Sequence, residues 1–158
     1  MDQTTNELIY LWRGKIKDLL DKGFNDEFFF FFLYYMCLDA WVTNESGLDG
    51  DGEKIRWLVS EVGILKDVFA DRKFDKSDLV SLKTFAPIED MRPNHRGDFV
   101  NLQNIENFEE VIRFIYQIRC NLFHGAKSPA NVRDKNLVDL ASKFLKKWIE
   151  CAHLEFNS

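Results

Sequence analysis

An arginine and a histidine five positions apart are the residues of this chain whose side chains are best suited to take part in a reaction. They are Arg119 and His124, in the stretch IRCNLFHG that covers residues 118–125. A guanidinium stays charged at neutral pH and can stabilise an anion, whereas an imidazole titrates near neutral pH and can give and take protons. This pair of residue types therefore indicates general acid–base chemistry at an anionic centre.

The apolar pattern around the motif puts Arg119 in an unusual position. Phe108, Ile112, Ile115, Arg119 and Leu122 follow one another at spacings of 4, 3, 4 and 3 residues, which is typical of one face of an α-helix. An unpaired guanidinium on a buried face costs several kcal/mol. Arg119 must therefore pair with an acid, extend its head to water or line a site that receives an anion.

His124 would not face Arg119 if this helix continued straight, because the two positions are a net ~140° apart around an ideal helix. Gly125 is a residue that commonly ends helices. A histidine in the last turn lies near the negative end of the helix dipole, which favours its protonated form. Two copies of the chain related by a two-fold axis could bring both residue types into one cleft. A histidine that only caps helix carbonyls is the alternative interpretation.

Two other chemistries are disfavoured by the sequence. Cys120 lies four residues before His124, but the dipole near a helix C-terminus raises the pKa of a thiol and makes it less reactive. The three cysteines are far apart and form no Cys-x-x-Cys pair, so free, mostly buried thiols are expected. The segment DGDG is not a calcium loop, since neither Gly50 nor Gly52 as the sixth position places a glutamate at the twelfth. We therefore expect neither a metal nor another cofactor.

Helical periodicity runs through most of the chain, and no segment is typical of paired strands. A loop is expected over residues 43–53. The sequence predicts an all-α protein, a bundle of four to five helices in a single domain spanning residues 1–158, with a long irregular connection over residues 84–104 before the motif helix. Predicted helices cover residues 7–22, 53–69 and 106–123, a short helix could follow over residues 77–83, and a last helix carries the apolar residues from Leu137 to Ala152.

The most apolar segment is the run over residues 28–38, which follows Asn25 and Asp26 as candidate helix caps. Its eleven residues are well below the ~20 needed to span a bilayer, so no membrane association is expected. A helix that is apolar on all sides must be enclosed by other helices or by a second chain, which makes a homodimer plausible. The start of the chain lacks a cationic, apolar leader, and a cytoplasmic location is expected.

Charge is unevenly distributed along the chain. The net charge of -5 argues mildly against a general nucleic-acid coat protein. Residues 111–147, however, hold eight basic and two acidic side chains. Such a segment could face an anion, although a solvated helix face is the more common explanation.

The motif and its surroundings resemble the HEPN superfamily, whose hallmark is an arginine, four to six intervening residues and a histidine. Here four residues separate Arg119 from His124, FEEVIRFIYQI precedes the arginine, and AKSP and RDKNLVDLA follow the histidine. The resemblance is close over residues 108–145 and only architectural before them. It implies an all-α, usually dimeric protein and, in active members, a metal-independent endoribonuclease of toxin–antitoxin, phage-defence or RNA-processing systems.

The resemblance also implies roles for individual residues. Arg119 would stabilise charge on the phosphate, and His124 would act as general base or acid while the ribose 2′-hydroxyl attacks it, leaving a 2′,3′-cyclic phosphate. The polar residue that often follows the arginine directly in this family is Cys120 here. Asn121, one position further, is the candidate for a supporting role, together with Gly125 at the helix end.

RNA is the partner that this chemistry predicts. Lys127, Arg133 and Lys135 could hold the flanking phosphates, which would give the basic segment a purpose. A cognate antitoxin is a further candidate partner. Some antitoxin-modified members of the family carry a tyrosine two residues after the histidine, where this chain has Ala126.

Two other functions fit the sequence. One is a non-catalytic HEPN-like module that binds nucleotide, RNA or a partner protein. The other is a purely structural helical bundle in which Arg119 pairs with Asp39, Glu61 or another acid.

Overall fold

Helices account for almost all of the regular structure. The structure, a computed structural model, describes residues 3–23, 26–60, 63–123 and 131–152. These residues confirm the predicted all-α class, with seven helices and one small antiparallel sheet. The helices are α1 (Gln3–Asp21), α2 (Glu27–Ser46), α3 (Asp51–Ser60), α4 (Ile64–Ala70), α5 (Ser77–Lys83), α6 (Phe108–Phe123) and α7 (Val132–Cys151), and the strands are β1 (Ile88–Glu89) and β2 (Phe99–Val100).

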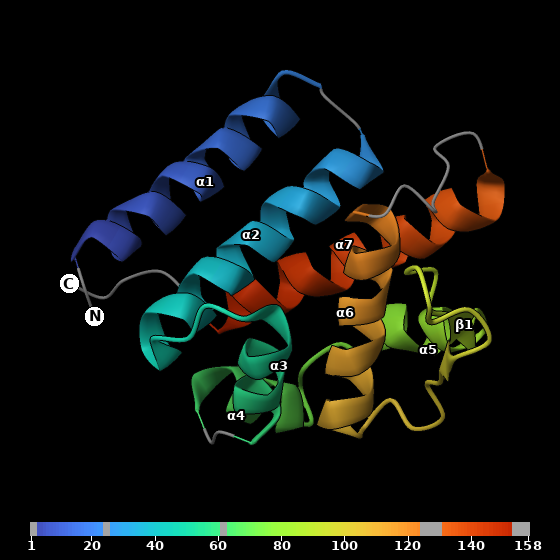
Figure 1. Cartoon of the computed structure of the whole chain (residues 1–158). Helices are drawn as coiled ribbons and strands as arrows, with labels where there is room; N and C mark the ends of the chain where they lie inside the picture. The colour runs from blue at the N-terminus through green and yellow to red at the C-terminus, as the bar shows by residue number, and fades with distance from the viewer. Residues whose placement is uncertain (1–2, 24–25, 61–62, 124–130, 153–158) are drawn as a thin grey trace.

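Helix α2 is central to the fold, and both of its ends are capped. The side chain of Asp26 accepts a hydrogen bond from the backbone N–H of Phe29 at 2.9 Å, as the sequence predicted for a cap at this position. At the other end Gly47 takes a left-handed conformation, with φ of 69°, and donates its N–H to Thr43. Figure 1 shows α2 antiparallel to α1 and lying along α7, so it joins the two outer helices of the bundle.

The apolar surface of α2 is mostly, but not completely, covered. Phe29 and Met36 keep 38% and 41% of their surface exposed. None of the helices in the described part of the chain combines the length and the apolarity needed to cross a lipid bilayer.

An aromatic cluster joins α4, α6 and α7. The Phe108 ring lies 5.2 Å from Phe69 and 5.8 Å from Trp148, and Phe144 stacks on Trp148 at 5.6 Å between ring centroids. The Trp148 indole also donates a hydrogen bond to the carbonyl of Leu65 at 2.8 Å. Full burial of side chains of this size contributes roughly 1.5–3 kcal/mol each. The cluster therefore holds the start of α6 in the core.

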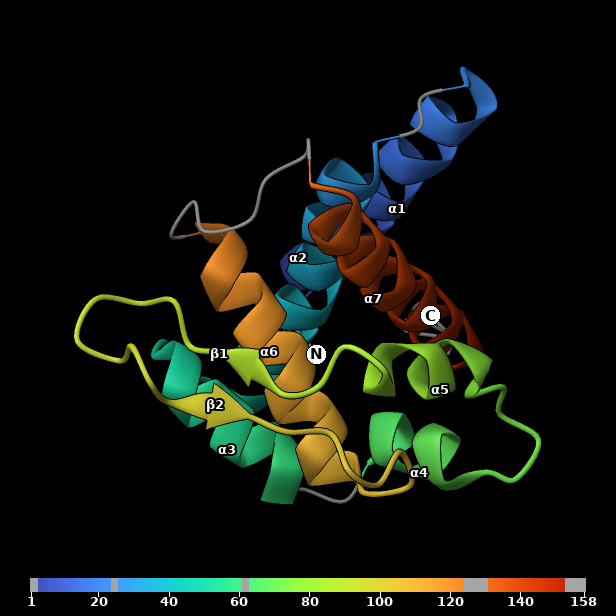
Figure 2. The same cartoon turned by 90° about the vertical axis from the view of Figure 1, so that its right-hand side faces the viewer.

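The connection over residues 84–104 contains a short β-hairpin, which the sequence did not predict. Ile88 pairs with Val100 and Glu89 with Phe99. Figure 2 shows the two strands passing in front of α6, and β2 packs against that helix. Strands of two residues are too short to produce an alternating apolar pattern, which is why no sequence signal marked them.

The prediction of one helix over residues 53–69 is wrong, and so is the count of four to five helices. Helix α3 ends at Ser60 and α4 begins at Ile64, after Gly63, whose backbone is extended. The loop expected over residues 43–53 is also shorter, because α2 continues to Ser46 and α3 begins at Asp51. The apolar period persists across residues 53–69 because both short helices bury one face, with Ile55 and Leu65 in the core.

Candidate functional site

Arg119 lies at the edge of the buried face of α6, one turn before the last described residue of the helix. Ile112 and Ile115, on the same stripe, are 3% and 2% exposed, whereas the Arg119 side chain is 21% exposed. The predicted placement of an arginine on a packing stripe is therefore confirmed. About a fifth of the side chain therefore remains open to solvent.

Three aromatic rings surround the Arg119 guanidinium. Its central carbon lies 4.2 Å from the ring centroid of Phe123, 6.0 Å from that of Tyr116 and 5.8 Å from that of Tyr35 on α2. Phe123 and Tyr116 are four residues after and three before Arg119, positions that are neighbours on a helix surface. The rings attract the cation through their faces and restrict its orientation.

Asp51, in the first turn of α3, supplies the carboxylate next to Arg119. Its Oδ2 lies 3.0 Å from Arg119 Nη1, and its side chain is 43% exposed. Burial lowers the pKa of Arg119 and the charge of Asp51 raises it, and the net shift is upward. Within the described residues, Arg119 Nε is buried and has no hydrogen-bond partner. The guanidinium is thus charged and paired with Asp51, while among the described residues its Nε lacks an acceptor.

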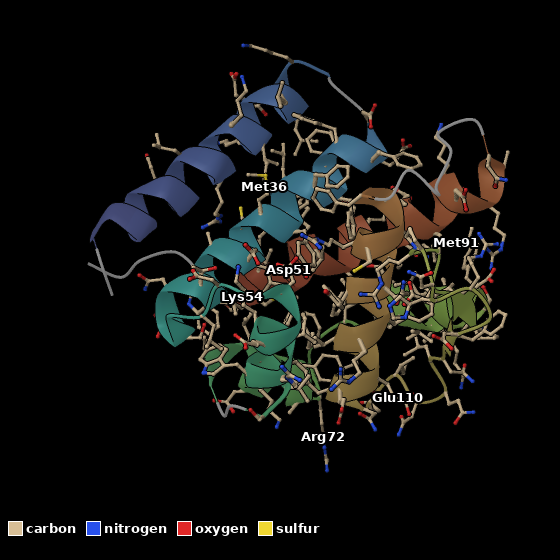
Figure 3. The ribbon with its side chains drawn as sticks, viewed as in Figure 1. Met36, Asp51, Lys54, Arg72, Met91 and Glu110 are labelled. Carbon is tan, nitrogen blue, oxygen red and sulfur yellow. The ribbon has the colours of Figure 1, made fainter. Side chains whose placement is uncertain are left out.

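The sequence named other acids as structural partners for Arg119. Asp39 instead pairs with Lys54, whose Nζ lies 3.1 Å from Asp39 Oδ1, and Glu61 lies outside the described residues. Figure 3 shows Asp51 and Lys54 at the end of α3 nearest to α2. A small pocket between α2 and α3 is lined by Tyr35, Asp39, Asp51 and Lys54, so the carboxylate of Asp51 lies between this pocket and the arginine.

The tyrosines beside Arg119 do not neutralise it. Burial raises the pKa of Tyr116 to about 12. Burial also raises the pKa of Tyr35, although the charge of Arg119 opposes the shift. Both phenols are therefore protonated and uncharged at neutral pH, and they contribute rings and hydroxyl groups to the site.

Asn121 has a structural position that the sequence did not reveal. Its side chain is fully buried and accepts hydrogen bonds from the backbone N–H of Met91 at 3.0 Å and from Gln117 Nε2 at 2.9 Å. Its amide nitrogen donates to the carbonyl of Glu89 at 2.9 Å. Asn121 therefore ties the β-hairpin to α6. Figure 3 labels Met91 in the loop of this hairpin.

The loop between the strands has its own charge network. Asp90 is 4% exposed and accepts hydrogen bonds from the backbone N–H, Nε and Nη2 of Arg92, including one of 2.6 Å from Nη2. The Arg92 hydrogen bonds hold the pKa of Asp90 at about 2, against the opposing effect of burial. Outside this pair, Arg96 bonds to Glu89 at 3.1 Å, and His95 Nδ1 lies 3.4 Å from Asp98. The charges of the loop are thus largely paired with each other.

Several described basic side chains of residues 111–147 pair with acids, most of them from other parts of the chain. Lys147 lies 2.9 Å from Asp75 and 2.8 Å from Asp78. Lys143 pairs with Asp139 within α7 at 2.8 Å. The predicted phosphate ligands Arg133 and Lys135 are exposed. Arg133 donates to the carbonyl of Phe85 at 3.0 Å, and Lys135 lies 4.0 Å from Glu27.

Three predicted site residues, His124, Gly125 and Lys127, lie outside the described residues. Helix α6 reaches Phe123, so the regular helix extends to the residue before His124. Cys120 is buried, in keeping with the expectation of a structural thiol. Across the described ranges, no cluster of three or more histidine, cysteine or carboxylate side chains is arranged to hold a metal ion.

Comparison of the chain with models of known protein families, with curated proteins and with solved structures finds no match. The fold and site define the class: an all-α protein with a partly exposed arginine, ringed by aromatic side chains, near the end of a packed helix. The HEPN resemblance stays a prediction. Chemically, the arrangement can bind an anion at Arg119 and place an aromatic surface beside it.

Proposed function

We propose that this protein is a metal-independent endoribonuclease of the HEPN type, in which Arg119 and His124 act on one phosphodiester. His124 takes the proton from a ribose 2′-hydroxyl, whose oxygen forms a bond to the adjacent phosphorus. The bond from phosphorus to the 5′-oxygen breaks, and a protonated imidazole gives that oxygen a proton. Arg119 stabilises the added negative charge on the phosphate oxygens. The products are a 2′,3′-cyclic phosphate and a free 5′-hydroxyl.

The incomplete pairing of the Arg119 guanidinium carries this proposal. Within the described residues, one partly exposed carboxylate contacts Nη1, and Nε has no hydrogen-bond partner. A guanidinium with a purely structural role is normally bonded along both edges, because unsatisfied buried donors are costly. Nε itself is shielded from solvent, so a phosphate would approach the exposed part of the Arg119 side chain, where its oxygens can accept from donors that Asp51 leaves open.

A homodimer is part of the proposal, because one straight helix directs Arg119 and His124 to different sides. A two-fold arrangement of two α6 ends would place two arginines and two histidines in one cleft. Mixing Arg119→Ala protein with His124→Ala protein tests this directly. If each active site combines residues from two subunits, the mixture regains part of the activity that both variants lack.

The decisive experiment is incubation of the full chain with single-stranded RNA in excess chelator. Wild-type protein should cleave it and leave 2′,3′-cyclic ends, and Arg119→Ala and His124→Ala should each lower the rate by at least about 100-fold. Arg113→Ala and His95→Ala are matched controls, because Arg113 pairs with Glu109 on the same helix and His95 lies in the hairpin loop. Both controls should cleave normally. Cleavage that requires a metal, or that survives both site substitutions, rules the mechanism out.

A non-catalytic module that binds nucleotide or RNA is the second candidate, and the Asp51 contact favours it. A carboxylate 3.0 Å from Arg119 Nη1 offsets part of the charge that would stabilise a transition state, while the exposed part of the side chain can still contact a bound anion. In that case RNA binding depends on Arg119, while the RNA stays intact and His124→Ala has no effect on binding.

A further inference from the structure

Phe123, the last described residue of α6, is the most exposed aromatic side chain of the candidate site. Most other apolar side chains of this helix are buried. The exposed fraction of Phe123 is 58%, whereas Ile118 and Phe114 on the same helix are fully buried. Isolated exposed apolar residues are common on protein surfaces and need no function. The contacts of the Phe123 ring distinguish it from such residues.

The Phe123 ring is held in place by a cation and a second ring. The Arg119 guanidinium lies over it, 4.2 Å from its centroid. The Phe32 ring of α2 meets it edge to face, with 4.9 Å between centroids. Such contacts each contribute roughly 0.5–1.5 kcal/mol. The ring is therefore oriented before any ligand arrives, while more than half of its surface stays open to solvent.

We propose that Phe123 is a stacking platform for an unpaired base of an RNA chain whose phosphate binds to Arg119. The inference rests on the proposed function, in which Arg119 binds an RNA phosphate. It adds that the RNA at this site is unpaired. A nucleotide carries its base and its phosphate on one sugar, so a ring and a guanidinium in direct contact match the two parts of a nucleotide. Aromatic rings that receive bases beside cationic groups are the usual means of binding single strands.

Stacking on Phe123 distinguishes unpaired from base-paired RNA and does not distinguish one base sequence from another. Every base has a π-face, so an isolated ring binds all four with similar strength. A base inside a duplex is already stacked between its neighbours and is not free to contact the ring. The structure therefore assigns to this site a loop, bulge or single-stranded segment, with little dependence on base identity.

The test uses a fluorescent 2′-O-methyl RNA oligonucleotide, which lacks the attacking hydroxyl and stays intact. Binding to the full chain is measured by anisotropy for the wild type and for Phe123→Leu and Phe123→Trp. Loss of a stacked base weakens binding by about 5- to 150-fold, so Phe123→Leu should show a loss in this range. Phe123→Trp should bind at least as tightly as the wild type. Phe99→Leu, at a 62% exposed aromatic on β2, is the matched control and should bind normally.

A second oligonucleotide separates stacking from an indirect effect on Arg119. It has the same phosphates but abasic sites in place of bases. The Phe123→Leu defect should disappear on it, because no base is left to stack. A defect of the same size on the abasic oligonucleotide shows that Phe123 acts only through Arg119 and overturns the platform. Equal binding of wild type and Phe123→Leu to the normal oligonucleotide overturns it as well.

The platform and the proposed nuclease can fail independently. If wild-type protein binds the 2′-O-methyl RNA in a Phe123-dependent manner but leaves unmodified RNA intact, the catalytic proposal fails and the platform stands. If RNA is cleaved while Phe123→Leu changes neither binding nor KM, the nuclease stands and the platform is wrong.

Duplex RNA of the same sequence should bind more weakly than the single strand, and equal binding contradicts the proposed selectivity.

Discussion

The carboxylate of Asp51 lies 3.0 Å from Nη1 of Arg119, and it joins the first turn of α3 to the motif helix α6. The acid is 43% exposed, so the pair is accessible to solvent and to a charged ligand. A phosphate approaching Arg119 would meet this carboxylate as a like charge. Asp51 is therefore both a partner of the arginine and a competitor of its proposed ligand.

Replacing Asp51 with alanine should strengthen the binding of intact 2′-O-methyl RNA. The substitution frees Nη1 and removes the repulsion, and because exposed ion pairs are worth roughly 0.2–1 kcal/mol, the gain should be about 1.5- to 5-fold. The free energy of unfolding should change by no more than about 1 kcal/mol for the same reason. Anisotropy and urea denaturation measure the two quantities.

Asp49→Ala is the charge-matched control for this prediction. Asp49 is exposed and lies two residues earlier, in the loop before α3, so its loss changes the net charge equally. Asp49→Ala should change RNA affinity only by the small effect of net charge, and Asp51→Ala should increase RNA affinity by more than that. Weaker RNA binding by Asp51→Ala would mean that the carboxylate positions Arg119 for its ligand instead of competing with it.

Replacing Asn121 with alanine should destabilise the protein and loosen the hairpin. The variant leaves the Met91 N–H and the Glu89 carbonyl without their side-chain partner, and each unsatisfied buried group costs about 1–3 kcal/mol. We expect the free energy of unfolding to fall by roughly 2–4 kcal/mol and the Met91 amide to exchange faster with deuterium. Asn136→Ala, at an exposed position on α7, should shift stability by at most about 0.5 kcal/mol. Unchanged protection of Met91 would show that Asn121 does not hold the loop.

Acid should destabilise the protein partly through Asp90. The Arg92 hydrogen bonds lower the pKa of Asp90 to about 2 from 3.8. Because the folded-state pKa lies below the unfolded one, this stabilisation is complete above about pH 5 and is lost as the pH falls toward 2. The shift corresponds to roughly 1–3 kcal/mol for this buried carboxyl.

Asp90→Asn isolates that contribution. The variant should be less stable than the wild type at pH 7, and the difference should shrink as the pH is lowered to about 2, since protonation removes the same charge. Urea denaturation at a series of pH values measures it. A difference that is constant over this range would assign the loss to packing and not to the charge of Asp90.

Trp148→Phe should destabilise the packing of α7 against α4. The indole N–H bonds to the Leu65 carbonyl at 2.8 Å inside the core, and its removal leaves a buried acceptor unsatisfied at a cost of about 1–3 kcal/mol. Trp41→Phe is the control, because Trp41 is only partly buried and a smaller change is expected. Equal losses in chemical denaturation would contradict a special role for the Trp148 hydrogen bond.

Local features of the fold could be predicted from the sequence because they depend on nearby residues. The apolar period set the long helices and the stripe that includes Arg119, and Asp26 signalled the start of α2. The contact of Arg119 with Phe123 follows from their four-residue spacing on one helix. The short hairpin and the break at Gly63 could not be predicted from the sequence, because neither one lengthens or interrupts an apolar pattern.

The sequence by itself determined the class of fold and the place of a cation on a packing stripe. Only the tertiary structure decided that Asp51 is the partner of that cation, that Asn121 holds a distant loop, and that Lys147 is paired with Asp75. Helix periodicity is a property of residues a few positions apart, whereas these contacts join residues at least thirty positions apart. Any of several exposed acids could have met Arg119, and chain packing selected one.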